Sequence, residues 1–272
     1  MNGVETCSLL ANGPADVDYV DVDVAAMEPD DRGPALLLIH GLGCDRSIWD
    51  PLIPRLATRR RVLAVCCRGS GGSRPHDDVA WSTADMAGDV ARLIEDRSLS
   101  SVDVIGLSMG GTVALQLALD RPELVGRLAV IGSFAGFADE VRPFLDAEMK
   151  RVAGESMRES AQRRIETAFS EDVDTRMLSW VVDMVARMHK PWYERQVAAT
   201  FAFDVRNRLG EIMAPTTVIA GSADRTVPVE MVREVADGIS HARFVELDEA
   251  GHFVHLEEPD RLIAALDGWG LA

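Results

Sequence analysis

The sequence predicts an α/β protein with a mostly parallel sheet flanked by helices, and three observations carry this prediction. The apolar run at 35–41 ends in glycine, as a strand buried on both faces does. Similar runs alternate with helix-like stretches at close spacing, which indicates βαβ units. A long helical stretch at 135–207 then interrupts the alternation before strands and helices resume.

The first half of the chain alternates expected strands with expected helices. Residues 19–27 alternate apolar and polar side chains, as a half-buried antiparallel strand does. Pro51 and Pro54 weaken the expected helix around them, and Pro122 ends a later one. The expected strands are 19–27, 35–41, 61–67, 102–108 and 127–134, and the expected helices are 47–57, 83–97 and 109–122.

The second half begins with the helical stretch and then returns to strands. A helical insertion in a parallel α/β core predicts a lid over the carboxyl ends of the strands, where such sheets bind ligands. We therefore expect a core formed by 1–134 and 208–272, with a helical lid at 135–207. The expected strands after the lid are 216–222 and 242–252, and the expected helices are 229–240 and 258–270.

Charge restricts the classes of partner. The 28 basic and 44 acidic residues give a formal charge of −16, which would repel nucleic acids and anionic membranes. We therefore expect a small-molecule substrate, no nucleic-acid partner and no membrane partner. The sequence leaves a homo-oligomer open.

The start of the chain and its cysteines bear on the cellular compartment. The beginning of the chain lacks a basic segment followed by an apolar one, so we expect no secretory signal. The four cysteines, Cys7, Cys44, Cys66 and Cys67, show no C-x-x-C spacing. Reduced thiols in a cytoplasmic protein fit this pattern best.

The residues GLSMG at 106–110 lie between an expected strand and an expected helix. In the G-x-S-x-G pattern the serine adopts a strained backbone, so that its hydroxyl projects from the sheet. Gly106 and Gly110 remove side chains that would collide with neighbouring elements. Ser108 is therefore the candidate nucleophile, and such a serine needs a base to take its proton.

Six histidines could supply that base. His252 is the leading candidate, because it lies in a loop between the last expected strand and the last expected helix. His255 is the nearest rival and is interpreted as a packing or supporting residue. His76 and His241 are typical of surface loops, and His189 in the lid is a candidate for contact with substrate.

A carboxylate must orient the histidine and stabilise its cation. Asp224 follows an expected strand directly, at the same end of the sheet as Ser108. Asp248 and Glu249 are closer to His252 in the sequence, but neither follows a separate strand. The order Ser108, Asp224, His252 is the order of a hydrolase triad on a doubly wound sheet.

Acyl transfer also requires donors for the developing oxyanion. The backbone N–H groups of Leu42 and Met109 are the candidates, because Leu42 follows a buried strand and Met109 follows the serine. His40 is interpreted as a structural hydrogen-bonding residue. No carboxylate or cysteine pattern completes a metal site around His252, so we expect neither metal nor cofactor.

These motifs together resemble the α/β-hydrolase superfamily from about residue 17 onward. The resemblance is carried by "HGLG", "RGSGGS", "GLSMGG", "GSADRTVP" and "AGHFVHLEEPD". Within it the chain is similar to 3-oxoadipate enol-lactonases, small carboxylesterases and RsbQ-like regulatory hydrolases. The resemblance implies an eight-stranded sheet with the lid inserted after the sixth strand. Cys66 departs from the pattern, since many relatives have aspartate there.

The leading interpretation is a serine hydrolase that cleaves a small ester or lactone through an acyl-enzyme. Carbon–carbon bond hydrolysis or perhydrolysis at the same site is one alternative, and a small-molecule sensor or regulatory protein is another. Four lid residues are candidates for substrate contact, although their helical spacing favours packing in the lid interior. They are Trp180, Met184, Met188 and Trp192.

Overall fold

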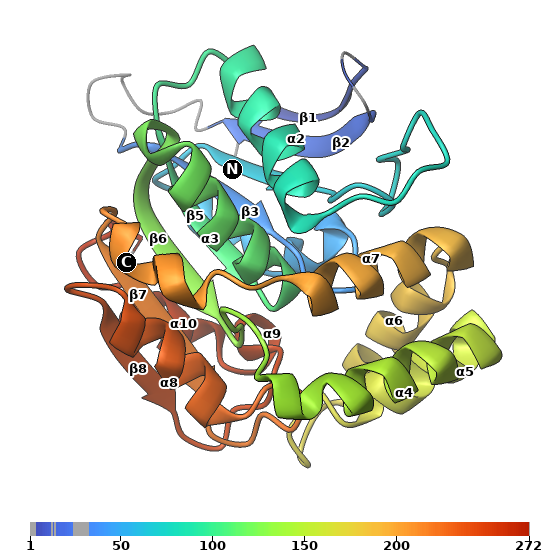
Figure 1. Cartoon of the computed structure of the whole chain (residues 1–272). Helices are drawn as coiled ribbons and strands as arrows, with labels where there is room; N and C mark the ends of the chain where they lie inside the picture. Colours follow the sequence, from blue (N-terminus) through green and yellow to red (C-terminus); the bar gives the residue numbers. More distant parts are fainter. Residues whose placement is uncertain (1–3, 12, 14, 24–32, 272) are drawn as a thin grey trace.

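An eight-stranded sheet of order β1-β2-β4-β3-β5-β6-β7-β8 is the centre of the structure (Figure 1). The computed structural model describes residues 4–11, 13, 15–23 and 33–271. β2 pairs antiparallel with β1 and β4, and all the other pairs are parallel. This confirms the predicted fold class. The strands are β1 (Val4–Leu10), β2 (Val17–Asp23), β3 (Ala35–Ile39), β4 (Val62–Val65), β5 (Val102–Leu107), β6 (Val125–Ile131), β7 (Thr216–Gly221) and β8 (Arg243–Leu247).

Helices flank the sheet, and four of them form an insertion between β6 and β7. Figure 1 shows α4, α5 and α6 gathered beside one end of the sheet, with α7 leading back toward it. The helices of the core are α1 (Ile53–Leu56), α2 (Thr83–Asp96), α3 (Met109–Asp120), α8 (Val229–Gly238), α9 (Val254–Glu257) and α10 (Pro259–Ala265). The helices of the insertion are α4 (Arg142–Gly154), α5 (Met157–Glu166), α6 (Thr175–Ala186) and α7 (Lys190–Ala202).

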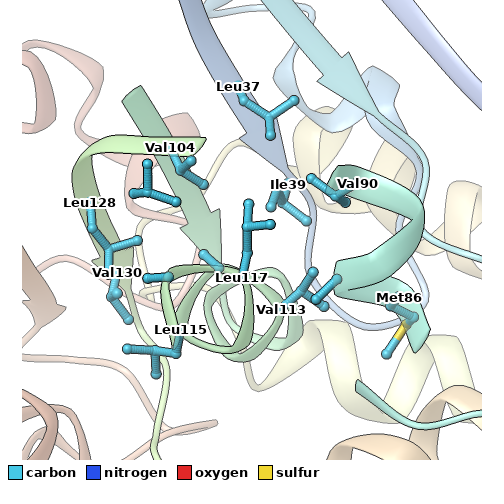
Figure 2. Packing of buried hydrophobic residues seen from close by; sticks show 14 of the residues in the cluster. Leu37, Ile39, Met86, Val90, Val104, Val113, Leu115, Leu117, Leu128 and Val130 are labelled. Atoms are coloured by element: carbon cyan, nitrogen blue, oxygen red, sulfur yellow. The ribbon is translucent and has the colours of Figure 1, made fainter. Parts of the chain in front are cut away.

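The two faces of the sheet bury separate apolar clusters, because successive strand residues point to opposite sides. Leu37 and Ile39 of β3 join the cluster beneath α2, α3 and α8. Figure 2 shows Val113 and Leu117 of α3 facing these strand side chains. Leu36 and Leu38 point into the other cluster, which includes α1, α10 and much of the insertion. Both faces are covered, as a parallel sheet requires.

Several elements differ from the sequence expectation. β1 was not predicted, and the expected strand at 19–27 is observed at Val17–Asp23, with 24–27 outside the described residues. The expected helix at 47–57 is split into a 3₁₀ turn at Arg46–Trp49 and the short α1. The reason is Pro51, which supplies no N–H to continue a helix from the preceding turn.

A buried ion pair links the start of β4 to β5. Arg60 precedes β4 and donates to Asp103 of β5 over 2.7 Å, with both side chains at most 4% exposed. The same guanidinium also donates to the carbonyl oxygens of Pro34 and Trp269. Arg60 therefore connects two strands with the segment after α10.

We expect Asp103→Ala to lower the free energy of unfolding by about 3–5 kcal/mol, because the Arg60 charge stays buried without its partner. Urea denaturation measures the loss. Glu246→Ala is the matched control, since its ion pair with Arg233 is about half exposed and should contribute about 1 kcal/mol or less. Equal losses in both variants would contradict the assignment.

Candidate active site

Ser108 lies at a sharp turn between β5 and α3. Its backbone has φ 54° and ψ −120°, a left-handed conformation that non-glycine residues rarely adopt. The Ser108 amide donates to the carbonyl oxygen of Ile131 over 2.8 Å, and the Ser133 hydroxyl donates to the Ser108 carbonyl over 2.7 Å. A Cβ on Gly106 would collide with the backbone of Gly110. The strain expected from the sequence is therefore present, and neighbouring strands hold it in place.

Asp224 and His252 come together from two further strand ends. Asp224 follows β7, and His252 lies in the loop after β8. His252 Nδ1 is 2.7 Å from Asp224 Oδ2, and both side chains are almost completely buried. The other carboxylate oxygen accepts from the amides of Thr226 and Val227 over 2.7 and 3.0 Å. Asp224 is thus fixed by its own loop and can orient the imidazole.

Ser108 and His252 line one cavity of about 440 Å³. Among the described residues, the Ser108 hydroxyl forms no hydrogen bond with His252, whereas Asp224 and His252 are hydrogen-bonded. Such catalytic contacts are often long before a substrate is bound. The cavity lies where β5, β7 and β8 end, which is the ligand-binding edge of a parallel α/β sheet.

The expected oxyanion donors lie beside the serine. Leu42 lines the cavity, and Met109 is the first residue of α3. Within the described part of the chain, neither backbone amide donates to another group. The amide of Cys44 donates to the Gly41 carbonyl over 3.1 Å and closes the turn that contains Leu42. Both N–H groups are therefore available to an acceptor.

The cavity wall is largely aromatic and aliphatic, and much of it comes from the insertion. Phe134 follows β6, its ring centroid lies 4.4 Å from that of Phe137, and the Phe137 ring lies 5.8 Å from Phe201 of α7. Leu145 of α4 and Ile165 of α5 also line the cavity. An apolar wall near three polar side chains is typical of a small-molecule site.

The four lid residues named from the sequence as candidates for substrate contact do not line this cavity. Met184 is buried against the second apolar cluster, and Trp180 and Met188 pack against the same cluster. Trp192 packs against the first cluster. Their helical spacing reflects a packed face, and the cavity uses other faces of the insertion.

Comparison with known proteins places these features in a family. The sequence pattern of the Alpha/beta hydrolase family matches residues 36–265, which include Ser108, Asp224 and His252. The chain belongs to this family of enzymes. The protein is therefore a hydrolase.

Several relatives resemble the hydrolase over most of its length. It is 30% identical to a pyrrolizixenacetamide deacetylase of Xenorhabdus hominickii, over 87% of this chain and 91% of that protein. It is 27% identical to a pimeloyl-[acyl-carrier protein] methyl ester esterase of Nitrosomonas europaea, over 89% and 97%. The enol-lactonase from Burkholderia xenovorans superposes with a TM-score of 0.85 at 26% identity, over 96% and 99%.

The remaining histidines of the hydrolase have other roles. The Cys67 amide donates to His40 Nε2 over 2.9 Å, and Nδ1 of the same ring lies 2.8 Å from the Gly41 carbonyl oxygen. Burial lowers the pKa of His40, so the neutral ring acts as a structural link. Burial also lowers the pKa of His255 to about 3, and its ring lies 4.3 Å from Trp49.

Three histidines lie on the surface. His76 and His241 are exposed, as the sequence predicts. His189 is exposed at the start of α7, where its ring lies 4.6 Å from that of Trp192. It does not line the cavity, so the suggested contact with substrate is corrected.

Cys66 occupies the position where the resemblance to α/β-hydrolases leads us to expect aspartate. Its thiol accepts from the Arg46 amide over 3.3 Å and lies 3.4 Å from the Asp18 carboxylate. Burial raises the pKa of the thiol well above its usual value. Asp18 also accepts from the Gly72 amide over 2.9 Å. A carboxylate from β2 therefore anchors the 68–73 loop.

The insertion is hydrogen-bonded directly to the loop that carries His252. The His252 amide donates to the Ala168 carbonyl over 2.7 Å. Glu257 of α9 accepts from the amides of Ser170 and Gly251, over 2.9 and 3.2 Å. The segment between α5 and α6 thus fixes the backbone on both sides of the histidine.

A charged wall of the cavity was missed by sequence reasoning. Arg151, Arg163, Arg164 and Arg225 line the cavity together with Glu148. The only available sequence signal was Arg225, which directly follows Asp224. The others are ordinary helix-surface residues in the sequence, and their gathering depends on how α4 and α5 pack.

Two features are absent from the described residues. Among them, no group of three or more histidine, cysteine, aspartate or glutamate side chains could hold a metal ion. No helix in that part of the chain is long and apolar enough to span a bilayer.

Proposed function

We propose that the protein is a serine hydrolase that cleaves a small ester or lactone through an acyl-enzyme. One observation carries the proposal: a carboxylate-oriented imidazole shares a cavity with a serine held in a strained turn. Asp224 and His252 are 2.7 Å apart, which is the geometry that fixes the tautomer of a catalytic histidine.

The proposed reaction has two halves. His252 Nε2 takes the Ser108 proton as the serine oxygen attacks the acyl carbon, and Asp224 stabilises the imidazolium. The amides of Leu42 and Met109 donate to the oxyanion, where each such donor contributes about 3 kcal/mol in the transition state. His252 then protonates the leaving alkoxide. In the second half it activates a water molecule that releases the acyl group from Ser108.

The cavity favours a small, mainly apolar substrate. Its volume of about 440 Å³ suits a small organic molecule, and phenylalanine side chains form much of its wall. The names of the relatives, a deacetylase, a methyl ester esterase and an enol-lactonase, support acyl-transfer chemistry at this site. A small molecule is accordingly the proposed partner. The free thiols of the adjacent Cys66 and Cys67 support a reducing, cytoplasmic compartment.

A fluorophosphonate probe tests the proposal. We expect the probe to label one residue, Ser108, and to abolish the hydrolysis of 4-nitrophenyl acetate. Mass spectrometry of the labelled protein identifies the site. Labelling at another serine, or multiple-turnover hydrolysis that persists after complete labelling of Ser108, would contradict the assignment. A single turnover without further release would favour a sensor.

A further inference from the structure

The strongest unassigned feature is the arginine and glutamate cluster on the cavity wall contributed by α4 and α5. Arg163 lies 2.8 Å from Glu155 and 2.9 Å from Glu148. Arg151 lies 3.1 Å from Glu155. These ion pairs lower the pKa of Glu155 to about 2, chiefly through the hydrogen bond from Arg163. Glu155 is therefore ionised at neutral pH, and arginines contact both glutamates.

Arg164 is the arginine of this cluster with the longest contact to a carboxylate. Its nearest carboxylate oxygen belongs to Glu148, at 3.6 Å, and Arg163 contacts the same oxygen more closely. In the described part of the chain, the Arg164 guanidinium makes no hydrogen bond. Three arginines face two glutamates, so the cluster keeps one positive charge on the wall of a cavity.

Arg164 is not required for the local structure of its helix. It lies in the last turn of α5, where a cation can stabilise unpaired carbonyl groups. The Thr167 hydroxyl already reaches the carbonyl oxygens of Arg163 and Arg164, over 3.4 and 3.0 Å. The Arg164 side chain is 22% exposed, and the cavity is where it can meet a ligand.

The surroundings of Arg164 make an anion favourable there. A largely buried guanidinium that makes no hydrogen bond is costly, and a charged hydrogen bond with a carboxylate offsets that cost. Leu42 and Cys44 line the same cavity as Arg164. The cation therefore shares the cavity with one of the two candidate oxyanion donors.

We propose that Arg164 binds a carboxylate on the acyl part of the substrate, so that the enzyme prefers esters or lactones of dicarboxylic acids. The apolar wall formed by Phe134, Phe137 and Phe201 then accommodates the methylene groups between the two carbonyl carbons. This inference rests on the proposed serine hydrolase function and adds a substrate class to it.

The test compares two esters within each variant. Half-esters of succinic, glutaric and adipic acid with 4-nitrophenol carry a free carboxylate, and the corresponding half-amides are uncharged controls of equal length. For the best chain length, we expect kcat/KM to favour the carboxylate by about 10- to 100-fold, the range of a charged hydrogen bond. In Arg164→Met the ratio should fall to near one, and Arg164→Lys should restore part of it.

Two control variants locate the effect. Arg158→Met lies on the same helix, but Arg158 is exposed and paired with Asp183, so the ratio should remain that of the wild type. Arg225 also lines the cavity, and it donates to the Phe169 carbonyl oxygen over 3.3 Å. If Arg225→Met loses the kcat/KM preference for the carboxylate and Arg164→Met keeps it, the assignment to Arg164 is overturned. A wild-type enzyme without preference for the carboxylate would overturn the proposal.

A binding measurement separates this inference from the proposed function. In a Ser108→Ala background, adipate at ten times its Kd should raise Tm by about 2–4 °C, and Arg164→Met should abolish the shift. Absence of the shift, or its persistence in Arg164→Met, overturns the anion site even if esters are hydrolysed. A normal shift without hydrolysis of any ester overturns the function and leaves the anion site standing.

Discussion

Ser108→Ala should reduce kcat for ester hydrolysis at least about 10⁴-fold, because Ser108 supplies the hydroxyl that forms the acyl-enzyme in the proposed mechanism. The Leu42 and Met109 amides remain in this variant, so we expect a residual rate above that of water alone. Stopped assays with 4-nitrophenyl acetate measure the loss. The fold should survive, since the turn is held by backbone hydrogen bonds of Ser108 and by Ser133.

A solvent-exposed serine of the insertion serves as the control. Ser179 is exposed on α6 and does not line the cavity, so Ser179→Ala should retain the wild-type rate. Thermal unfolding of both variants checks that any loss of rate is not a loss of structure. A Ser108→Ala protein that unfolds normally and still hydrolyses the ester within about tenfold of the wild type would remove Ser108 from the mechanism.

Asp224→Asn should lower kcat by about 10⁴-fold with little change in the fold. The amide can keep one oxygen toward the Thr226 and Val227 amides, but its NH₂ group then faces His252 Nδ1. That arrangement favours the tautomer with the proton on Nε2, which cannot accept the serine proton. Steady-state kinetics over a range of pH values measure the effect.

Asp248→Asn is the matched control, because Asp248 is nearer to His252 in the sequence. Its carboxylate is exposed and accepts from the Ser222 hydroxyl over 3.3 Å, away from the imidazole. We expect this variant to hydrolyse esters at the wild-type rate. The opposite result, a larger loss in Asp248→Asn than in Asp224→Asn, would exchange the roles of the two carboxylates.

The positions of Ser108, Asp224 and His252 could be predicted because each follows a strand. Parallel strands place their carboxyl ends at one edge of a sheet, so the alternation of strands and helices was enough to bring these loops together. The same reasoning favoured Asp224 over Asp248, and the structure places Asp224 against His252. The strained backbone of Ser108 could be predicted because Gly106 and Gly110 flank it in the G-x-S-x-G pattern.

The cavity wall could not be predicted in the same way. Helical spacing shows that Met184 lies on a buried face, but it does not show what that face packs against. In the sequence Arg164 is an ordinary residue of a polar helix, because its contact with Glu148 depends on how α4 packs against α5. β1 was missed because its pairing with β2 depends on a neighbour that its own short pattern does not specify.

The hydrogen bond from the His252 amide to the Ala168 carbonyl has a consequence for substrate entry. A movement that lifts the α5–α6 connection away from the sheet must first break this bond, and it then releases the backbone that aims the imidazole. Substrate entry and the orientation of His252 are thereby coupled. While the α5–α6 connection is lifted, His252 could not accept the Ser108 proton. Return of the connection would close the cavity and restore the orientation of His252.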